Sequence, residues 1–160
     1  MVAAPLSPSI ASLLAEEVRT VEEFVGVLKQ EEAALVTIDL DALLALVERK
    51  GKLSGDLNML LERREAALKS GGMPPGRQGM AKWLAATDKS GQTAKLWARL
   101  LELAGQARSQ NEINGKLIAL HFQHNQRALT TLMAAANHAM TYDANGIQHG
   151  GGSGRLLGSA

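Results

Sequence analysis

The sequence contains no cysteine, which excludes disulfide bonds and thiolate metal sites and is typical of a cytosolic protein. It also lacks any uncharged apolar run long enough to span a membrane. Residues 1–9 have neither the basic start nor the apolar core of a signal peptide. Together these absences predict a cytoplasmic protein that does not insert directly into a membrane.

Aromatic residues are scarce, at 3% of the chain, and alanine and leucine supply most of an apolar share of 46%. Alanine and leucine lose little freedom in a helix, whereas strands favour β-branched and aromatic side chains. The 160 residues suffice for one domain with a substantial core. The composition therefore predicts an all-α protein.

Neither sign of charge is in excess, because the formal net charge is +1. Such a small charge gives no general attraction to nucleic acid or to an anionic membrane. The first 69 residues are net acidic and the remaining residues are net basic. This asymmetry would help two segments of one bundle to attract each other, and it says little about partners.

Two amphipathic helices are predicted in the first half of the chain. The first covers about 10–36, with Ser7 or Ser9 as its N-cap. Its buried stripe, in steps of three and four, is formed by Leu14, Val18, Val21, Val25, Leu28 and Leu35.

The second helix begins after a cap at Asp39 or Asp41 and runs to about Lys69. Its seam alternates in the same way and consists of Leu43, Leu46, Lys50, Leu53, Leu57, Leu60, Arg64 and Ala67. This alternation predicts coiled-coil-like packing, and the short connection predicts an antiparallel pair with the first helix.

The run Gly-Gly-Met-Pro-Pro-Gly at 71–76 is the clearest break in the chain, because prolines cannot donate backbone hydrogen bonds. A short helix at about 77–86 should follow. Asp88 or Ser90 can then cap a long helix that continues to about Met140. At about 1.5 Å per residue this last helix spans roughly 75 Å, so part of it is expected to project beyond the bundle.

The predicted fold class is therefore all-α. Its architecture is an elongated antiparallel three-helix bundle with coiled-coil-like packing and a short extra helix before the long third one. A single helical domain is expected over residues 1–147. Residues 148–160 are rich in glycine, and they are expected to form a flexible tail.

The end of the long helix carries almost no charge. Between Leu117 and Met140 the only formally charged residue is Arg127. The apolar residues of this segment do not all fit one narrow stripe, and a helix that is apolar on several sides needs burial on several sides. Either the bundle supplies that burial, or another protein binds there through an adaptable, methionine-containing surface.

Patterns that carry catalysis or metal binding are weak. His121 and His124 can share a helix face, but a metal site needs further ligands and none is near. The glycine-rich runs lack the Gly-Lys-Ser/Thr of a phosphate loop, and there is neither a cysteine nor a Gly-x-Ser-x-Gly nucleophile motif. The sequence predicts no enzyme, no cofactor and no metal site.

Acidic pairs recur along the first helix, at Glu16–Glu17, Glu22–Glu23 and Glu31–Glu32. Carboxylate metal sites in helical bundles use Glu-x-x-His motifs, and none occurs here. We therefore interpret the pairs as a solvated helix face. The basic residues of the long helix are too dispersed, and too poor in neighbouring aromatics, to indicate a nucleic-acid site.

Several strings resemble the FlgN family of flagellar export chaperones over roughly residues 10–147. The most specific is Asn111-x-x-Asn114-Gly115-x-Leu117-Ile118, followed at the end of the same helix by Tyr142-x-x-x-Gly146. The others are Glu22-x-Phe24, Gln30-Glu31-x-x-Ala34-Leu35, Asp39 with Leu43, Leu46 and Lys50, the stretch from Leu57 to Arg64, and Trp83-Leu84.

The resemblance implies a cytosolic chaperone for the two hook-filament junction proteins, FlgK and FlgL. It would hold their C-terminal helical ends in soluble form and deliver them to the type III export gate. The substrate-binding residues that it implies are Leu117, Leu120, Leu129, Leu132, Met133 and Met140. Tyr142 matches the family's tyrosine that is associated with docking on the gate component FlhA.

Two other functions stay open at this point. A structural coiled-coil protein or adapter would self-associate through the same surface and form a stable dimer, whereas the chaperone interpretation favours a monomer. A nucleic-acid-binding bundle would instead show steeply salt-dependent binding.

Overall fold

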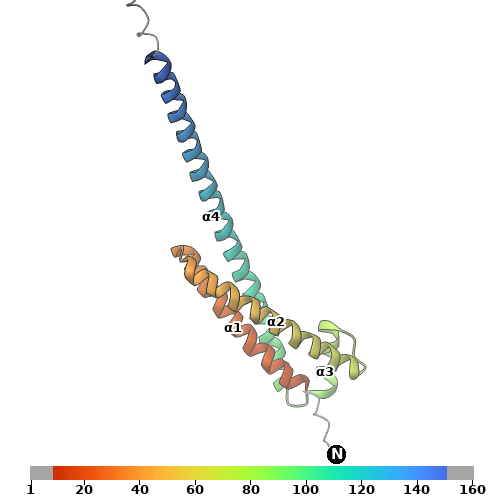
Figure 1. Cartoon of the computed structure of the whole chain (residues 1–160). Coiled ribbons are helices and arrows are strands. Elements are labelled where there is room, and N and C mark those ends of the chain that lie inside the picture. Colours follow the sequence, from red (N-terminus) through yellow and green to blue (C-terminus); the bar gives the residue numbers. More distant parts are fainter. Residues whose placement is uncertain (1–8, 151–160) are drawn as a thin grey trace, which may run out of the picture. The chain divides into compact units, whose positions relative to one another are not determined.

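The computed structural model describes the backbone of residues 9–150 and the side chains of residues 9–141. Four helices make up the regular structure of this range (Figure 1): α1 is Ile10–Thr37, α2 is Leu40–Ser70, α3 is Gly76–Thr87 and α4 is Gln92–Gly150. The predicted all-α class and the short helix before the long last one are confirmed. Within the described residues, no helix has the length and apolar character needed to cross a membrane.

Side chains cap the helices where the sequence predicts. The Ser9 hydroxyl accepts a hydrogen bond from the Ser12 amide at 3.1 Å, and Asp39 accepts one from the Ala42 amide at 3.0 Å. Both candidates act at the start of α4, because Asp88 accepts from Ala94 and Ser90 accepts from Gln92. Each bond satisfies an amide that has no partner within its helix. The alternative cap Ser7 lies outside the described residues.

The predicted end of the last helix near Met140 is wrong, because α4 continues to Gly150. An Asn-Gly pair lies inside the helix at 145–146. One glycine inside a helix costs about 1 kcal/mol, which weakens a helix without ending it. The segment has no proline, the residue that would break the helix.

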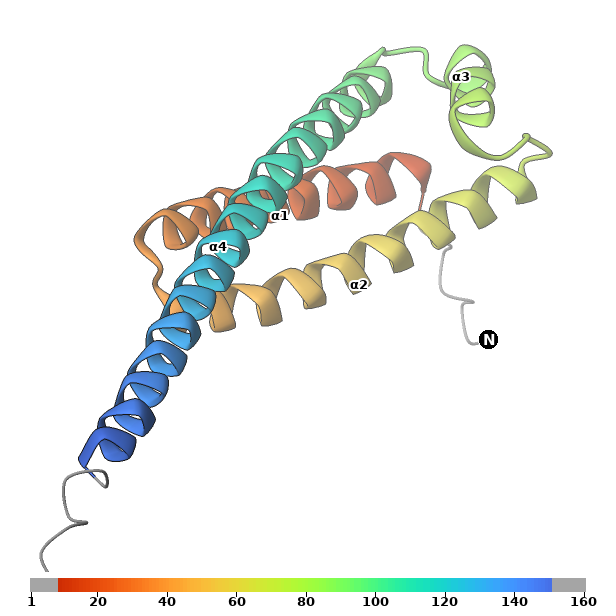
Figure 2. The same ribbon diagram turned by 90° about the horizontal axis from the view of Figure 1, so that it is seen from above.

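By its internal contacts the chain divides into two units, residues 1–117 and 118–160. In the first unit, α1 and α2 lie side by side and run in opposite directions, as Figure 1 and Figure 2 both show. Ile38 joins them with a left-handed backbone, at a φ of 55°. A β-branched residue rarely adopts this conformation. The antiparallel pairing predicted for the first two helices is confirmed.

The hydrophobic core of the first unit draws on all four helices. Every apolar residue that the sequence predicted to be buried on the first helix, from Leu14 to Leu35, is buried in the structure. The central cluster consists of Ile10, Leu14, Val18, Val21, Val25, Leu68, Met80, Leu100 and Leu103. The start of α4 therefore packs against α1.

The interpretation of the acidic pairs as a solvated face is wrong for Glu17 and Glu31, which are both buried. The cations predicted on the seam of the second helix lie opposite them. Arg64 Nε donates to Glu17 Oε1 at 2.8 Å, and Lys50 Nζ donates to Glu31 Oε2 at 3.1 Å. A buried carboxylate needs such a partner, because it has lost its water.

Arg64 connects several elements around its pairing with Glu17. Its guanidinium also donates to Glu65 at 3.3 Å and lies 5.1 Å from the centre of the Trp97 ring of α4. Glu65 in turn accepts the Gly76 amide at the start of α3. Burial raises the pKa of Glu17, while the Arg64 guanidinium acts in the opposite direction.

Candidate partner-binding site

A polar layer fastens α4 to α1 and α2 at the end of the first unit, and its members are Glu31, Lys50, Asn111 and Asn114. Asn114 is 1% exposed, and its amide donates to the Leu28 carbonyl at 2.9 Å and to Glu31 Oε2 at 2.6 Å. Lys50 donates to Asn111 Oδ1 at 3.1 Å as well as to Glu31. Asn111 and Asn114 belong to the most specific of the strings described above that resemble the FlgN family. In the structure they set the register of α4 against both neighbouring helices.

Replacing Asn114 with alanine should lower the free energy of unfolding by about 1–3 kcal/mol, because the Leu28 carbonyl and Glu31 lose a buried donor. Urea unfolding followed by circular dichroism measures the change. Asn111→Ala is the matched control on the exposed side of the layer, and its effect should be smaller. Equal effects at the two positions would contradict the layer's dependence on the buried amide.

Beyond the polar layer, the apolar side chains of α4 are uncovered. Leu117, the last residue of the first unit, is half-buried. In the second unit, the five other residues implied by the resemblance are all exposed, from 49% at Leu120 to 71% at Met140. The described chain does not bury this segment, so its apolar surface is available to a partner.

Five exposed apolar side chains of the second unit share one face of α4. Successive residues turn by about 100° around a helix, which places the five within a sector of roughly 60°. They are Ile118, Phe122, Leu129, Met133 and Met140, and we call them the stripe. Leu132 lies at its edge. Seven-residue steps connect Phe122 to Leu129 and Met133 to Met140, which is the spacing of a helix-binding seam.

Ile118 and Phe122 are absent from the residues implied by the resemblance, although the helical spacing alone would have found them. Leu120 is the opposite case. It lies nine residues before Leu129, and this separation places the two side chains on opposite sides of a helix. The structure therefore brings Leu129, Leu132, Met133 and Met140 together and separates Leu120 from them.

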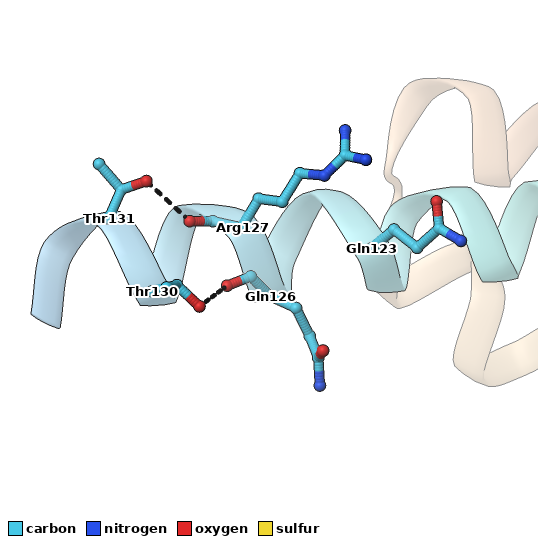
Figure 3. Close-up of a pocket in the computed structure, with 5 residues that line it drawn as sticks. All are labelled: Gln123, Gln126, Arg127, Thr130 and Thr131. Carbon is cyan, nitrogen blue, oxygen red and sulfur yellow. Dashed lines mark hydrogen bonds between the residues drawn. The ribbon is translucent and has the colours of Figure 1, made fainter. Parts of the chain in front are cut away.

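Figure 3 shows five polar residues that project from α4 within the same stretch of helix as the stripe. They are Gln123, Gln126, Arg127, Thr130 and Thr131. Each threonine hydroxyl donates to a carbonyl one turn earlier, at 2.9 Å. Arg127 lies roughly 150° from the centre of the stripe, so the stripe itself carries no formal charge.

The remaining predicted residues add no chemistry to this surface. His124 is exposed and His121 is half-buried. Among the described residues, no three His, Asp or Glu side chains are grouped so that they could hold a metal ion. The side chain of Tyr142 lies outside the described residues. What the described surface offers is an uncharged apolar face for another helix.

The sequence model of one family, described as FlgN protein, matches residues 1–150. The chain belongs to the FlgN family. FlgN proteins are flagellar export chaperones for hook-associated proteins, and the family is not enzymatic. Comparisons with curated proteins and with solved structures gave no significant match.

The FlgN match spans both the polar layer and the stripe. The two features divide the family-like string between them, because Asn111 and Asn114 belong to the layer and Ile118 begins the stripe. In this FlgN protein the string therefore marks the point at which α4 changes from core packing to an exposed apolar face.

Proposed function

We propose that this FlgN protein binds the C-terminal helical ends of FlgK and FlgL through the stripe and delivers them to the flagellar type III export gate. One observation carries the proposal: an uncharged apolar face with helical spacing is exposed on α4. The amphipathic ends of secretion substrates tend to self-associate. A chaperone that covers their apolar face keeps them separate until export.

The physical mechanism is helix-to-helix burial without covalent chemistry or a cofactor. Burial contributes about 25 cal/mol per Å² of apolar surface, and the ordering of both partners offsets much of it. The expected affinity is therefore moderate, which suits a complex that must release its cargo at the gate. Methionines at 133 and 140 can adapt to two different substrate helices.

Calorimetric titration of the full chain with the purified C-terminal segments of FlgK and FlgL tests the proposal. Binding of one segment per chain is expected, with a negative heat-capacity change because apolar surface is buried. The absence of binding to both segments would contradict it.

Docking at the gate is assigned to a different residue, Tyr142, which should meet FlhA. Tyr142→Ala is expected to leave the affinity for the FlgK segment unchanged and to weaken co-precipitation of the loaded chaperone with the cytoplasmic part of FlhA. Thr141→Ala, one position earlier, is the matched control and should affect neither. Loss of both interactions in Tyr142→Ala, or of neither, would contradict a separate docking point.

The same proposal includes the cellular and domain context. The chaperone acts in the cytoplasm as a monomer. One chaperone domain covers residues 1–147 and is followed by a glycine-rich tail at 148–160.

A further inference from the structure

One polar side chain, that of Asn125, interrupts the apolar face of α4. In the second unit a heptad seam follows this helix in alternating steps of four and three residues. Its positions are Ile118, Phe122, Asn125, Leu129, Leu132 and Ala136. Asn125 is seven residues from both Ile118 and Leu132, and seven residues return a side chain to within about 20° of the same direction. The asparagine therefore lies inside the face that the stripe occupies, and not on its border.

The amide of Asn125 is available to a partner. The residue is exposed, as are Phe122 and Leu129 on either side of it along the helix. Within the described range its side chain makes no hydrogen bond to the protein, whereas Thr130 and Thr131 donate to carbonyls of their own helix. When a bound helix covers the stripe, the amide loses its water and needs a new partner.

The core shows how α4 satisfies an asparagine on this side of the helix. Asn114 lies eleven residues before Asn125, which is about three turns, so the two side chains lie within roughly 20° of each other around the axis. In the core, the Asn114 amide donates to the Leu28 carbonyl at 2.9 Å and to the Glu31 carboxylate at 2.6 Å, both on α1. An opposing helix with an acceptor oxygen at the matching level therefore satisfies such an amide.

We propose that Asn125 determines the register and the specificity of the helices that the stripe binds, an inference that rests on the proposed function. The cargo that fits is an amphipathic helix whose apolar seam carries one asparagine, glutamine or carboxylate opposite Asn125. A seam of apolar residues alone, or one in a shifted register, leaves the amide buried without a partner. A single asparagine in the seam of a coiled coil sets register in the same way, at a cost in stability. The methionines of the stripe adapt to many helices, and Asn125 restricts which of them bind.

A double-mutant cycle with two designed amphipathic peptides tests this role. One peptide has leucine throughout its apolar seam, and the other has a single asparagine in the middle of that seam. Each is titrated calorimetrically into the unaltered full chain and into Asn125→Leu. The leucine peptide should bind the variant about tenfold more tightly, because no amide is then left unpaired. The asparagine peptide should bind the variant more weakly, because its own amide has lost its partner.

Gln123→Leu is the matched control. It also replaces an exposed side-chain amide with leucine, but its position two residues away lies about 160° from Asn125 around the helix (Figure 3). It should change the affinities of the two peptides by the same factor.

The outcomes separate this inference from the proposed function. An Asn125→Leu variant that changes both affinities equally, or an unaltered chain that binds neither peptide, would overturn the role of Asn125. If the peptides are distinguished as expected but the FlgK and FlgL segments do not bind, the proposed function alone is contradicted, and Asn125 still selects among helices.

Discussion

Glutamate at both Leu129 and Met133 is expected to weaken the capture of FlgK and FlgL C-terminal segments by more than about 100-fold, since binding would bury two unpaired carboxylates. Both side chains lie near the middle of the stripe, and both are exposed in the free chain, at 59% and 58%. The double substitution should therefore leave the fold intact. Calorimetric titration measures the affinity, and circular dichroism checks the helix content.

Leu120→Glu is the control that separates a specific face from general hydrophobicity. It introduces the same charge into the same exposed helix, but on the side opposite Leu129. Its effect on capture should stay within about threefold, as for a position outside the interface core. If Leu120→Glu abolished capture and the double variant bound normally, the binding face would lie on the other side of α4.

Arg64→Ala is expected to lower the free energy of unfolding by about 3–5 kcal/mol, because it leaves the buried carboxylate of Glu17 without its partner. Arg64 is 5% exposed, and its guanidinium pairs with Glu17 at 2.8 Å and lies over Trp97. The substitution thus removes an ion pair, a cation–π contact and packing volume between three helices. Urea unfolding at neutral pH measures the loss.

Two variants identify the cause of that loss. Arg49→Ala breaks the pair with Glu23, whose two side chains are about half exposed, and it should cost at most about 1 kcal/mol. The double variant Glu17→Gln, Arg64→Met removes both buried charges and keeps most of the volume, so it should recover much of the stability. Equal losses in the single Arg64→Ala variant and this double variant would show that packing, and not the unpaired charge, is responsible.

The loss should also depend on pH. Burial already raises the pKa of Glu17, and removing Arg64 removes an influence that lowers it. A carboxyl with a raised pKa holds its proton more tightly in the folded chain than in the unfolded one. The stability that this carboxyl contributes is therefore fully present below its ordinary pKa. It is lost as the pH rises through the pKa that the carboxyl has in the folded chain. The deficit of Arg64→Ala should be larger at neutral pH than near pH 4.5, the ordinary value.

Local patterns predicted the helices and most of their ends. Neighbouring residues decide three of these features: the buried apolar row of α1 from Leu14 to Leu35, the cap at Asp39 and the break at 71–76. Each of the three is present in the structure. The exception is the end of α4. There the sequence offers only an Asn-Gly pair, which weakens a helix without stopping it.

The buried acids show where local patterns stop being sufficient. Glu16 and Glu17 are adjacent and chemically identical, yet only Glu17 is buried. The sequence placed Arg64 and Lys50 on the seam of the second helix. Whether an acid of the first helix meets them depends on the register between the two helices, and local periodicity does not contain that register.

The candidate site shows the same division. Composition and the family-like string were enough to indicate an uncharged end of the last helix as the partner surface. Leu120 and Leu129 looked equivalent in that description, because hydrophobicity alone does not distinguish the sides of a helix. Helical spacing separates them and adds Ile118 and Phe122 to the face, and the structure adds that this face is exposed.

By itself, the sequence determined that this protein is helical, where its helices begin, and that it belongs with the FlgN chaperones. These properties depend on residues close together in the chain or on strings read in order. Only the tertiary structure decided which charges are buried, that the core packing of α4 ends at the Asn114 layer, and that the stripe stays exposed. Burial depends on the neighbours that folding brings from distant parts of the chain, and a local sequence pattern does not specify these long-range contacts.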